Sequence, residues 1–306
     1  DAGLMITASH NPPTDNGVKV FGADGFKLSS HVQDEIEALI QSDEELSVSF
    51  EKMGQISSPA NSYDDFLAFA KRTVSLSPRW SKLKICLDAA HGAGFKLAHE
   101  LLQSTGATVL ASGISPDGAN INVKCGALHT EALQEAVKSN GADIGIALDG
   151  DADRLIVVDE TGAEIDGDQL MGALALDYHA RGKLKGDTLV ATIMSNLGLE
   201  LKLKSAGIRL ERTKVGDRYV VERMREGGFN VGGEQSGHIV LTEFVTTGDA
   251  IISALQVIDI MVRKSQTASE VLNVFEPVPQ VLKNVSYGDA DPLETKQVKD
   301  SIAAAE

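Results

Sequence analysis

With 306 residues, 42% of them hydrophobic and 24% charged, the chain has the composition of a folded protein and, at roughly 150 residues per domain, the length of about two domains. Acidic residues outnumber basic ones by 44 to 28, and the resulting net charge of −16 argues against nucleic acid or an anionic membrane as partner. The sequence opens without a signal-peptide pattern, and two cysteines are too few for a disulfide framework. We therefore expect a cytoplasmic globular protein.

Two short strands and one helix are predicted at the start of the chain. Apolar patterning places the strands at Leu4–Ala8 and Val18–Gly22 and an amphipathic helix at His31–Ser42. These elements are too few to bury a core by themselves. We therefore expect this segment to be part of a domain that is cut short.

From Lys84 to Lys264, apolar runs alternate with amphipathic segments, the pattern of βα units with largely parallel strands. Two such sets, similar in the order of their elements, meet near residues 159–167. The expected strands lie at 84–89, 107–111, 188–194 and 208–214, with pairs within 142–159 and 229–242. The expected helices lie at 95–104, 130–141, 167–182, 196–207, 215–228 and 248–264. A strand at 280–287 and the start of another helix should follow, again as part of a domain.

A polar loop, TASHNPPTDNGVK, runs from Thr7 to Lys19. Its two prolines and its Asn-Gly pair predict a rigid, exposed loop. Ser9 is a candidate nucleophile or phosphate carrier, and His10 and Lys19 could supply the proton transfer that a serine hydroxyl needs. An isolated Ser-His pair is more often a turn with a capping serine, but the complete string is much more specific.

An acidic loop, DGDADR, follows the hydrophobic strand IGIAL. Asp149, Asp151 and Asp153 alternate at the C-terminal end of this strand, where open α/β sheets place ligands. Carboxylates at this spacing can converge on one hard cation, for which Mg²⁺ is the natural candidate. A solvated acidic turn is an alternative, whereas a calcium loop of the EF-hand kind is disfavoured because Arg154 stands where that loop needs glycine. Arg154 could also meet a phosphate.

A third loop, GGEQSGH, lies between two short predicted strands. Glu234, Ser236 and His238 alternate in it, so a locally extended backbone would place all three side chains on one face. Such a face suits the hydroxyls of a sugar. A hairpin turn with incidental polar residues is the alternative.

A fourth string, KVGDRYV, lies at a predicted strand-to-helix junction, where Lys214 and Arg218 bracket a glycine. Backbone N–H groups at a helix start together with cationic side chains make an anion site. The alternative is a turn with surface cations. The sequence contains neither GxxxxGK[ST] nor GxGxxG, so nucleotide binding has no support.

In this order and spacing, the strings TASHNP, DGDADR, KVGDRYV and GGEQSGH resemble the α-D-phosphohexomutase superfamily, and within it the bacterial members that act on glucosamine phosphates. The resemblance implies an α/β fold of consecutive related domains with mixed, mainly parallel sheets, four domains in all around a cleft. The chain would then hold the end of the first domain (1–50), the second (51–160), the third (161–275) and the start of the fourth (276–306). The fourth domain's phosphate-binding string, similar to RPSGTEP, is absent from the sequence.

The resemblance also implies a role for each candidate residue. Ser9 would carry a phosphoryl group, and His10 and Lys19 would be acid/base residues beside it, Lys19 as a base if neighbouring positive charge lowers its pKa. One Mg²⁺ would be bound by Ser9, Asp149, Asp151 and Asp153. The phosphosugar would be bound by Arg154, Lys214, Arg218, Glu234, Ser236 and His238.

The implied reaction moves a phosphoryl group between O6 and O1 of glucosamine phosphate, through phosphorylated Ser9 and a 1,6-bisphosphate, on the way to UDP-N-acetylglucosamine and the cell wall. The protein would be a monomer or homodimer that acts on a small phosphosugar. Members that act on mannose or glucose phosphates are the first alternative, because the serine and metal loops do not distinguish sugars. A metal-dependent sugar phosphatase, with water as the acceptor, and a non-catalytic sugar-phosphate-binding fragment are the others, and the chain could be inactive by itself.

Overall fold

The computed structural model describes residues 2–42, 47–283, 286 and 292–305, and within them the strands form three sheets. The first large sheet has the strand order β4-β3-β5-β6-β7. In it, β3 pairs in parallel with β4 and β5, whereas β5–β6 and β6–β7 are antiparallel pairs. The strands are β3 (Lys84–Asp88), β4 (Thr108–Ser112), β5 (Ile144–Leu148), β6 (Leu155–Asp159) and β7 (Glu164–Ile165).

The second large sheet has the order β11-β10-β8-β9. Its central strand β8 pairs in parallel with β9 and β10, and β10 pairs antiparallel with β11. Both sheets are therefore mixed, with parallel strands at their centres, as expected. The strands are β8 (Thr188–Thr192), β9 (Arg209–Thr213), β10 (Val231–Gly233) and β11 (Ile239–Leu241).

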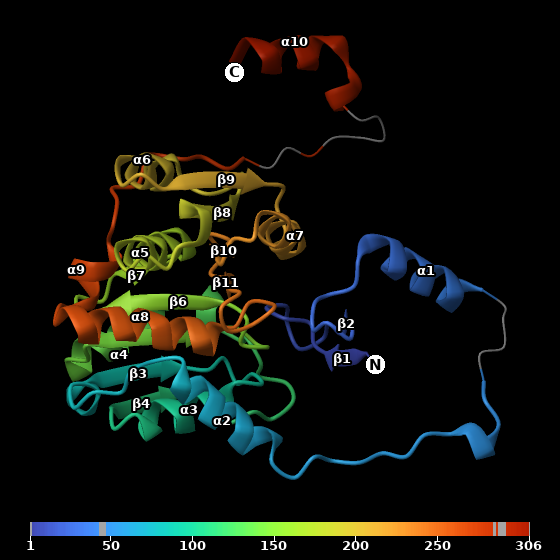
Figure 1. Cartoon of the computed structure of the whole chain (residues 1–306), viewed down its shortest axis with the longest axis horizontal. Coiled ribbons are helices and arrows are strands. Elements are labelled where there is room, and N and C mark those ends of the chain that lie inside the picture. Colours follow the sequence, from blue (N-terminus) through green and yellow to red (C-terminus); the bar gives the residue numbers. More distant parts are fainter. Residues whose placement is uncertain (1, 43–46, 284–285, 287–291, 306) are drawn as a thin grey trace.

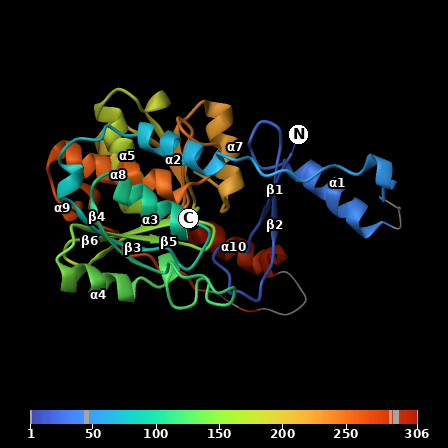
Figure 2. The same ribbon diagram turned by 90° about the horizontal axis from the view of Figure 1, so that it is seen from below.

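Helices cover both faces of each large sheet. In the first unit, α4 packs on one face and α3 and α8 lie on the other (Figure 2). In the second unit, α7 packs against β8 and β10, and a small cluster of buried apolar side chains fills the space between them. Helices α5 and α6 also contact this sheet. The helices are α2 (Ser62–Arg72), α3 (Phe95–Ser104), α4 (Glu131–Asn140), α5 (Gly167–Ala180), α6 (Leu197–Ser205), α7 (Asp217–Gly227), α8 (Ala250–Lys264) and α9 (Ala268–Leu272).

One contiguous hydrophobic core joins the two units. Its largest cluster contains fully buried side chains of the first sheet, such as Leu87, and of the second, such as Leu189. Helix α8 lies where they meet: it contacts β6 of the first sheet, β11 of the second, and α5. Thirteen of its fifteen residues are buried, so it serves as core for both units.

The third sheet is the hairpin of β1 (Gly3–Ile6) and β2 (Val18–Phe21). In Figure 1 it stands to the right of β6 and α8, while α1 (Ser30–Gln41) extends away from the sheets. Helix α1 buries none of its residues, and α10 (Lys296–Ala305) lies apart above β9 in the same view. The hairpin reaches the loop after β5 through its connecting segment, which contains Ser9, and through Lys19 of β2.

The strands and helices predicted for 84–264 are confirmed within one or two residues in nearly every case. Gly141 ends α4 in the left-handed conformation that glycine adopts freely, as the sequence indicated. The strand predicted at 280–287 is wrong where the structure describes it: residues 280–283 and 286 are not in a strand, and the remainder lies outside the described residues. Within the described ranges, no helix is both long and apolar enough to cross a membrane.

Candidate active site

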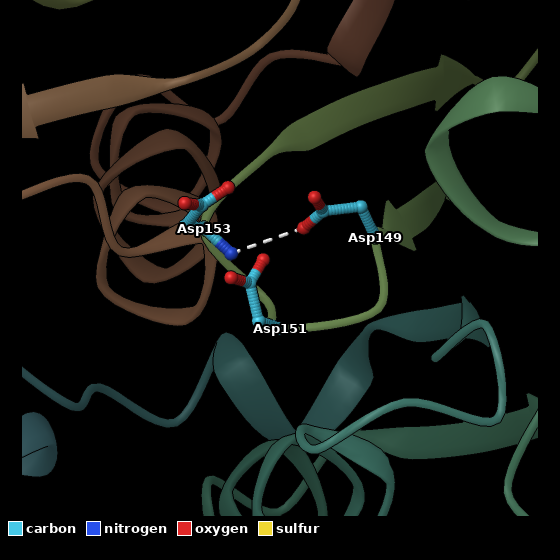
Figure 3. Close-up of side chains that lie close together, drawn as sticks. All are labelled: Asp149, Asp151 and Asp153. Carbon is cyan, nitrogen blue, oxygen red and sulfur yellow. Dashed lines mark hydrogen bonds between the residues drawn. The ribbon is translucent and has the colours of Figure 1, made fainter. Parts of the chain in front are cut away.

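The acidic loop connects β5 and β6, the hairpin at which the sheet changes from parallel to antiparallel pairing. Leu148 at the end of β5 pairs with Leu155 at the start of β6, so residues 149–154 must turn back tightly. The carboxylate of Asp149 closes this turn, because its Oδ1 accepts hydrogen bonds from the backbone N–H groups of Asp153 and Arg154, each at 3.1 Å. Figure 3 shows the first of these bonds and the carboxylates of Asp149, Asp151 and Asp153 gathered around one space.

The three aspartates fit a divalent cation. One carboxylate oxygen from each lies within 4.8 Å of the others, and Asp149 and Asp151 are buried. The Oδ1 atoms of Asp151 and Asp153 are also buried and have no hydrogen-bond partner in the described part of the chain. Buried oxygens of this kind cost free energy unless a partner is supplied, and a hard cation prefers such ligands. The expected metal ligands from this loop are thus brought together.

The serine loop reaches the aspartates across 140 residues of sequence. Ser9 Oγ donates a hydrogen bond to Asp149 Oδ2 at 3.1 Å, and His10 Nδ1 lies 3.4 Å from the same hydroxyl. The approach requires a glycine opposite: a Cβ added at Gly150 would lie 2.5 Å from the carbonyl oxygen of Ser9. The predicted nucleophile, its neighbouring histidine and the metal loop therefore form one site.

Ser9 adopts an unusual backbone conformation, with φ at +53°. Left-handed φ values are uncommon for residues other than glycine and persist where the surroundings hold them. Here Thr7 contributes, because its hydroxyl accepts a hydrogen bond from Ser9 N–H at 2.8 Å and donates one to Asp151 Oδ2 at 3.0 Å. The loop thus directs the Ser9 hydroxyl toward the aspartates.

Lys19, on β2, is paired with the aspartates. Its Nζ lies 2.5 Å from Asp151 Oδ2 and 2.8 Å from Asp153 Oδ2. Burial alone would lower the pKa of Lys19, but the charge of Asp153 and hydrogen bonds to both carboxylates outweigh it and raise the pKa. The expectation that neighbouring positive charge lowers this pKa is wrong, since the groups that surround Nζ are mainly acidic.

The pKa values of three neighbouring groups, Asp149, Asp153 and His10, are shifted by burial and by the charges around them. Burial raises the pKa of Asp149 to about 7, with help from the charges of Asp153 and Asp151. For Asp153 burial is outweighed by a hydrogen bond and charge from His238 and by Lys19, which hold its pKa below the usual range. Burial and the nearby Arg154 lower the pKa of His10, so its imidazole is neutral near pH 7 and can accept a proton.

His238 is built into the metal loop. It is only 3% exposed, its Nδ1 lies 3.4 Å from Asp153 Oδ2, and its Nε2 accepts a hydrogen bond from Gly248 N–H at 3.2 Å. The preceding Gly237 has φ +92°, and its carbonyl accepts from Leu155 N–H at 2.9 Å. A Cβ there would lie 2.3 Å from Leu155 O, so only glycine permits this contact between the GGEQSGH loop and β6.

The rest of the GGEQSGH loop is a turn, closed by a hydrogen bond from Gly237 N–H to Glu234 O at 3.0 Å. Of the two conformations that the sequence left open, the hairpin turn is therefore the one observed, and the three polar side chains do not share one face. Glu234 Oε1 accepts from the backbone N–H of Gly216 at 3.0 Å, Ser236 is exposed, and His238 is buried. The Glu234 side chain therefore connects this loop to the start of α7.

The two cations of KVGDRYV gather around Tyr219. Lys214 Nζ lies 5.9 Å and the Arg218 guanidinium 5.0 Å from the centroid of its ring, and Arg218 also donates to the Tyr219 hydroxyl at 3.2 Å. The predicted strand-to-helix junction is confirmed, because Gly216 lies between β9 and the first residue of α7. Arg154 lies elsewhere, on the metal loop, with a buried Nε that has no hydrogen-bond partner among the described residues.

Comparison with known proteins explains this arrangement. Three sequence models match the chain in order: phosphoglucomutase/phosphomannomutase alpha/beta/alpha domain I over residues 1–47, domain II over 63–162 and domain III over 166–278. The chain belongs to the phosphoglucomutase/phosphomannomutase family. The resemblance to phosphohexomutases and the expected fold class are thereby confirmed.

Curated members of the family cover the whole chain. The phosphoglucosamine mutase of Mesorhizobium japonicum is 51% identical over 306 residues, and that of a Ruegeria species 53% over 312 residues. The chain spans 68% of the length of each.

Solved structures of the family share the fold. A phosphoglucomutase/phosphomannomutase family protein from Burkholderia thailandensis aligns with a TM-score of 0.78 at 24% identity, over 91% of this chain and 59% of its own. An N-acetylphosphoglucosamine mutase from Aspergillus fumigatus, solved in complex with GlcNAc-6P and magnesium, aligns with a TM-score of 0.66 at 22% identity, over 91% of this chain and 73% of its own.

Four further residues of this family member lie at the site and were not singled out from the sequence. Thr7 and Asn122 contact the Ser9 backbone, and Asp217 lies 3.5 Å from His238 Nε2 and forms an ion pair with Lys27. Thr7 and Asp217 stand inside the strings that carried the resemblance. Asn122 and Lys27 lie outside those strings, because only the folded chain brings them to the site.

Proposed function

We propose that the protein interconverts glucosamine 6-phosphate and glucosamine 1-phosphate through a phosphorylated Ser9 and a 1,6-bisphosphate. Relatives about half identical to the chain are named phosphoglucosamine mutase, which supports this choice of reaction. The observation that carries the chemistry is the contact between Ser9 Oγ and Asp149 in the cluster of three aspartates. Identity near 50% along the whole chain to phosphoglucosamine mutases supports the choice of sugar.

The residues around Ser9 support phosphoryl transfer with little covalent work by the protein. A hydroxyl of the sugar attacks the phosphorus of phosphoserine, the bond from phosphorus to Ser9 Oγ breaks, and the proton lost by the sugar hydroxyl is balanced by the proton that Ser9 Oγ gains as it leaves. The neutral His10 imidazole, 3.4 Å from Ser9 Oγ, is suited to move the proton of that hydroxyl in the dephosphorylated enzyme. Lys19 retains its proton and offsets part of the negative charge of Asp151 and Asp153.

The cofactor we propose is one Mg²⁺, held by Asp149, Asp151, Asp153 and Ser9, and it would supply neutralisation of phosphoryl charge. The magnesium in the Aspergillus fumigatus structure supports this choice of ion. The unpartnered oxygens of Asp151 and Asp153 are the local support for it.

The phosphosugar, in this proposal, is bound by side chains of the three remaining strings. Arg154, with its unpartnered buried Nε, is suited to a phosphate oxygen. Exposed Ser236 and half-buried Glu234 are suited to sugar hydroxyls, and Lys214 and Arg218 to the phosphate at the other end. Buried His238 acts in the same site through Asp153. We place the reaction in the cytoplasm, which the two free thiols of Cys86 and Cys125 support.

Turnover of three substrates tests the proposal. The intact protein, primed with a hexose 1,6-bisphosphate and Mg²⁺, should convert glucosamine 6-phosphate faster than the mannose and glucose 6-phosphates. Preference for mannose or glucose phosphate would contradict the choice of sugar. Steady release of inorganic phosphate without a sugar product would point to a phosphatase instead.

A further inference from the structure

Asn122 lies between the serine loop and the first large sheet. It belongs to the loop between β4 and α4, and it is only 8% exposed. Its backbone N–H donates to the carbonyl of Ala90 at 3.0 Å, which fixes it to the loop that follows β3. Its side chain is therefore presented from a well-anchored position.

The side-chain amide of Asn122 forms hydrogen bonds with the backbone on both sides of His10. Its Nδ2 donates to Ser9 O at 2.8 Å and to Asn11 O at 3.1 Å. Both partners are carbonyl oxygens, which can only accept, so the amide must present its NH₂ group to them. These bonds join residues more than a hundred positions apart and are the direct link from this loop to the serine loop.

The bond to Ser9 O acts on a strained residue. Ser9 has φ at +53°, and its N–H is already held by Thr7, so Asn122 fixes the other end of the same residue. Gly150 packs against both partners, since a Cβ there would lie 2.5 Å from Ser9 O and 2.7 Å from Asn122 Nδ2. Ser9 is thus held at its N–H by Thr7 and at its carbonyl by Asn122, with Gly150 packed against that carbonyl.

We infer that Asn122 is a positioning residue, which holds Ser9 in its left-handed conformation so that Oγ faces the aspartates. The inference rests on the proposed function for its effect on turnover. The Asn122 amide group donates to two carbonyls of the serine loop, so its loss should slow chemistry at Ser9 and leave substrate affinity nearly unchanged.

Two substitutions remove the amide in different ways. Asn122 has φ at +60°, which Asp and Gly both tolerate. Asn122→Asp keeps the size but turns a donor into a carboxylate that faces two carbonyl oxygens, whereas Asn122→Gly removes the side chain without backbone strain. If Asn122→Asp does not fold, Asn122→Gly carries the test alone.

Asn120→Asp is the matched control. It makes the same amide-to-carboxylate change in the same loop, where the Asn120 side chain donates to Ser115 O and not to the serine loop. We expect Asn120→Asp to behave as the wild type.

Kinetics and hydrogen exchange of the intact protein give two separate readouts. Each Asn122 variant should lower kcat by about 100-fold, and the rate at which hexose 1,6-bisphosphate phosphorylates Ser9 should fall by about the same factor. A misplacement of a reacting group by about 1 Å can have an effect of this size, whereas KM should change by less than about threefold. Backbone amides within residues 7–17 should exchange faster than in Asn120→Asp.

The inference is overturned if the Asn122 variants match Asn120→Asp in kcat and in exchange, or if KM rises while kcat is unchanged. Failure of the proposed function would be seen separately, as absence of sugar-phosphate turnover by the wild type. In that case the exchange of residues 7–17 still decides whether Asn122 holds the serine loop.

Discussion

Among single residues, Asp168 in the first turn of α5 shows what burial does to a carboxylate away from the candidate site. It has no exposed surface, and its Oδ2 accepts a hydrogen bond from Asn196 N–H at 2.7 Å. Burial raises its pKa to about 6 against an ordinary value of 3.8, because hydrogen bonds from its neighbours only partly replace the lost water.

A raised pKa in the folded state makes stability fall as pH rises. The contribution of Asp168 is fully present below pH 3.8 and is lost as the pH passes through about 6. Between pH 5 and 7.5, ionisation of Asp168 should lower the free energy of unfolding by about 1.4 kcal/mol. Asp168→Asn should therefore show a smaller decrease over that range in urea titrations. An unchanged pH slope would assign the titration to another group.

The sequence predicted the residues of the candidate site better than their protonation. Ser9, His10 and the three aspartates could be chosen because each stands in a string with a chemical reason for its spacing. The pKa of Lys19 could not be predicted, because it depends on carboxylates 132 and 134 positions away whose distance only the fold sets. Asn122 was missed for the same reason.

At the scale of elements, the spacing of apolar residues predicted strands and helices well wherever one face of the element, or the whole element, is buried. Helix α3 has the predicted bounds, and β5 is buried at every residue, as the continuous apolar run IGIAL indicated. For the GGEQSGH loop the alternation of polar residues left an extended backbone and a hairpin turn open, and the positive φ of Gly237 allows the turn that is observed. Local conformation at a glycine depends on what packs against it, here β6.

At the scale of the whole molecule, one core spans both large sheets, so we expect the two units to unfold together. Trp80, the only tryptophan, is fully buried in the first unit and reports on it by fluorescence. Leu189 is fully buried on β8 of the second sheet and belongs to the same hydrophobic cluster. Leu189→Ala should cost about 2–5 kcal/mol, the range for such a cavity.

The Leu189→Ala transition should shift equally whether followed by Trp80 fluorescence or by far-UV circular dichroism. Leu201→Ala, on the exposed side of α6, is the control and should leave both unchanged. If the fluorescence transition stays in place while circular dichroism shows two steps, the units are energetically separate.

The central claim is that Ser9 carries the phosphoryl group that reaches the sugar. Mass spectrometry of the intact protein after incubation with a hexose 1,6-bisphosphate and Mg²⁺ tests it most directly. We predict one added phosphoryl group on the peptide that contains Ser9, lost to a sugar bisphosphate when glucosamine 6-phosphate is added, and absent from Ser9→Ala. Turnover of glucosamine 6-phosphate by Ser9→Ala at the wild-type rate, or wild-type turnover with no phosphate on Ser9, would contradict the account.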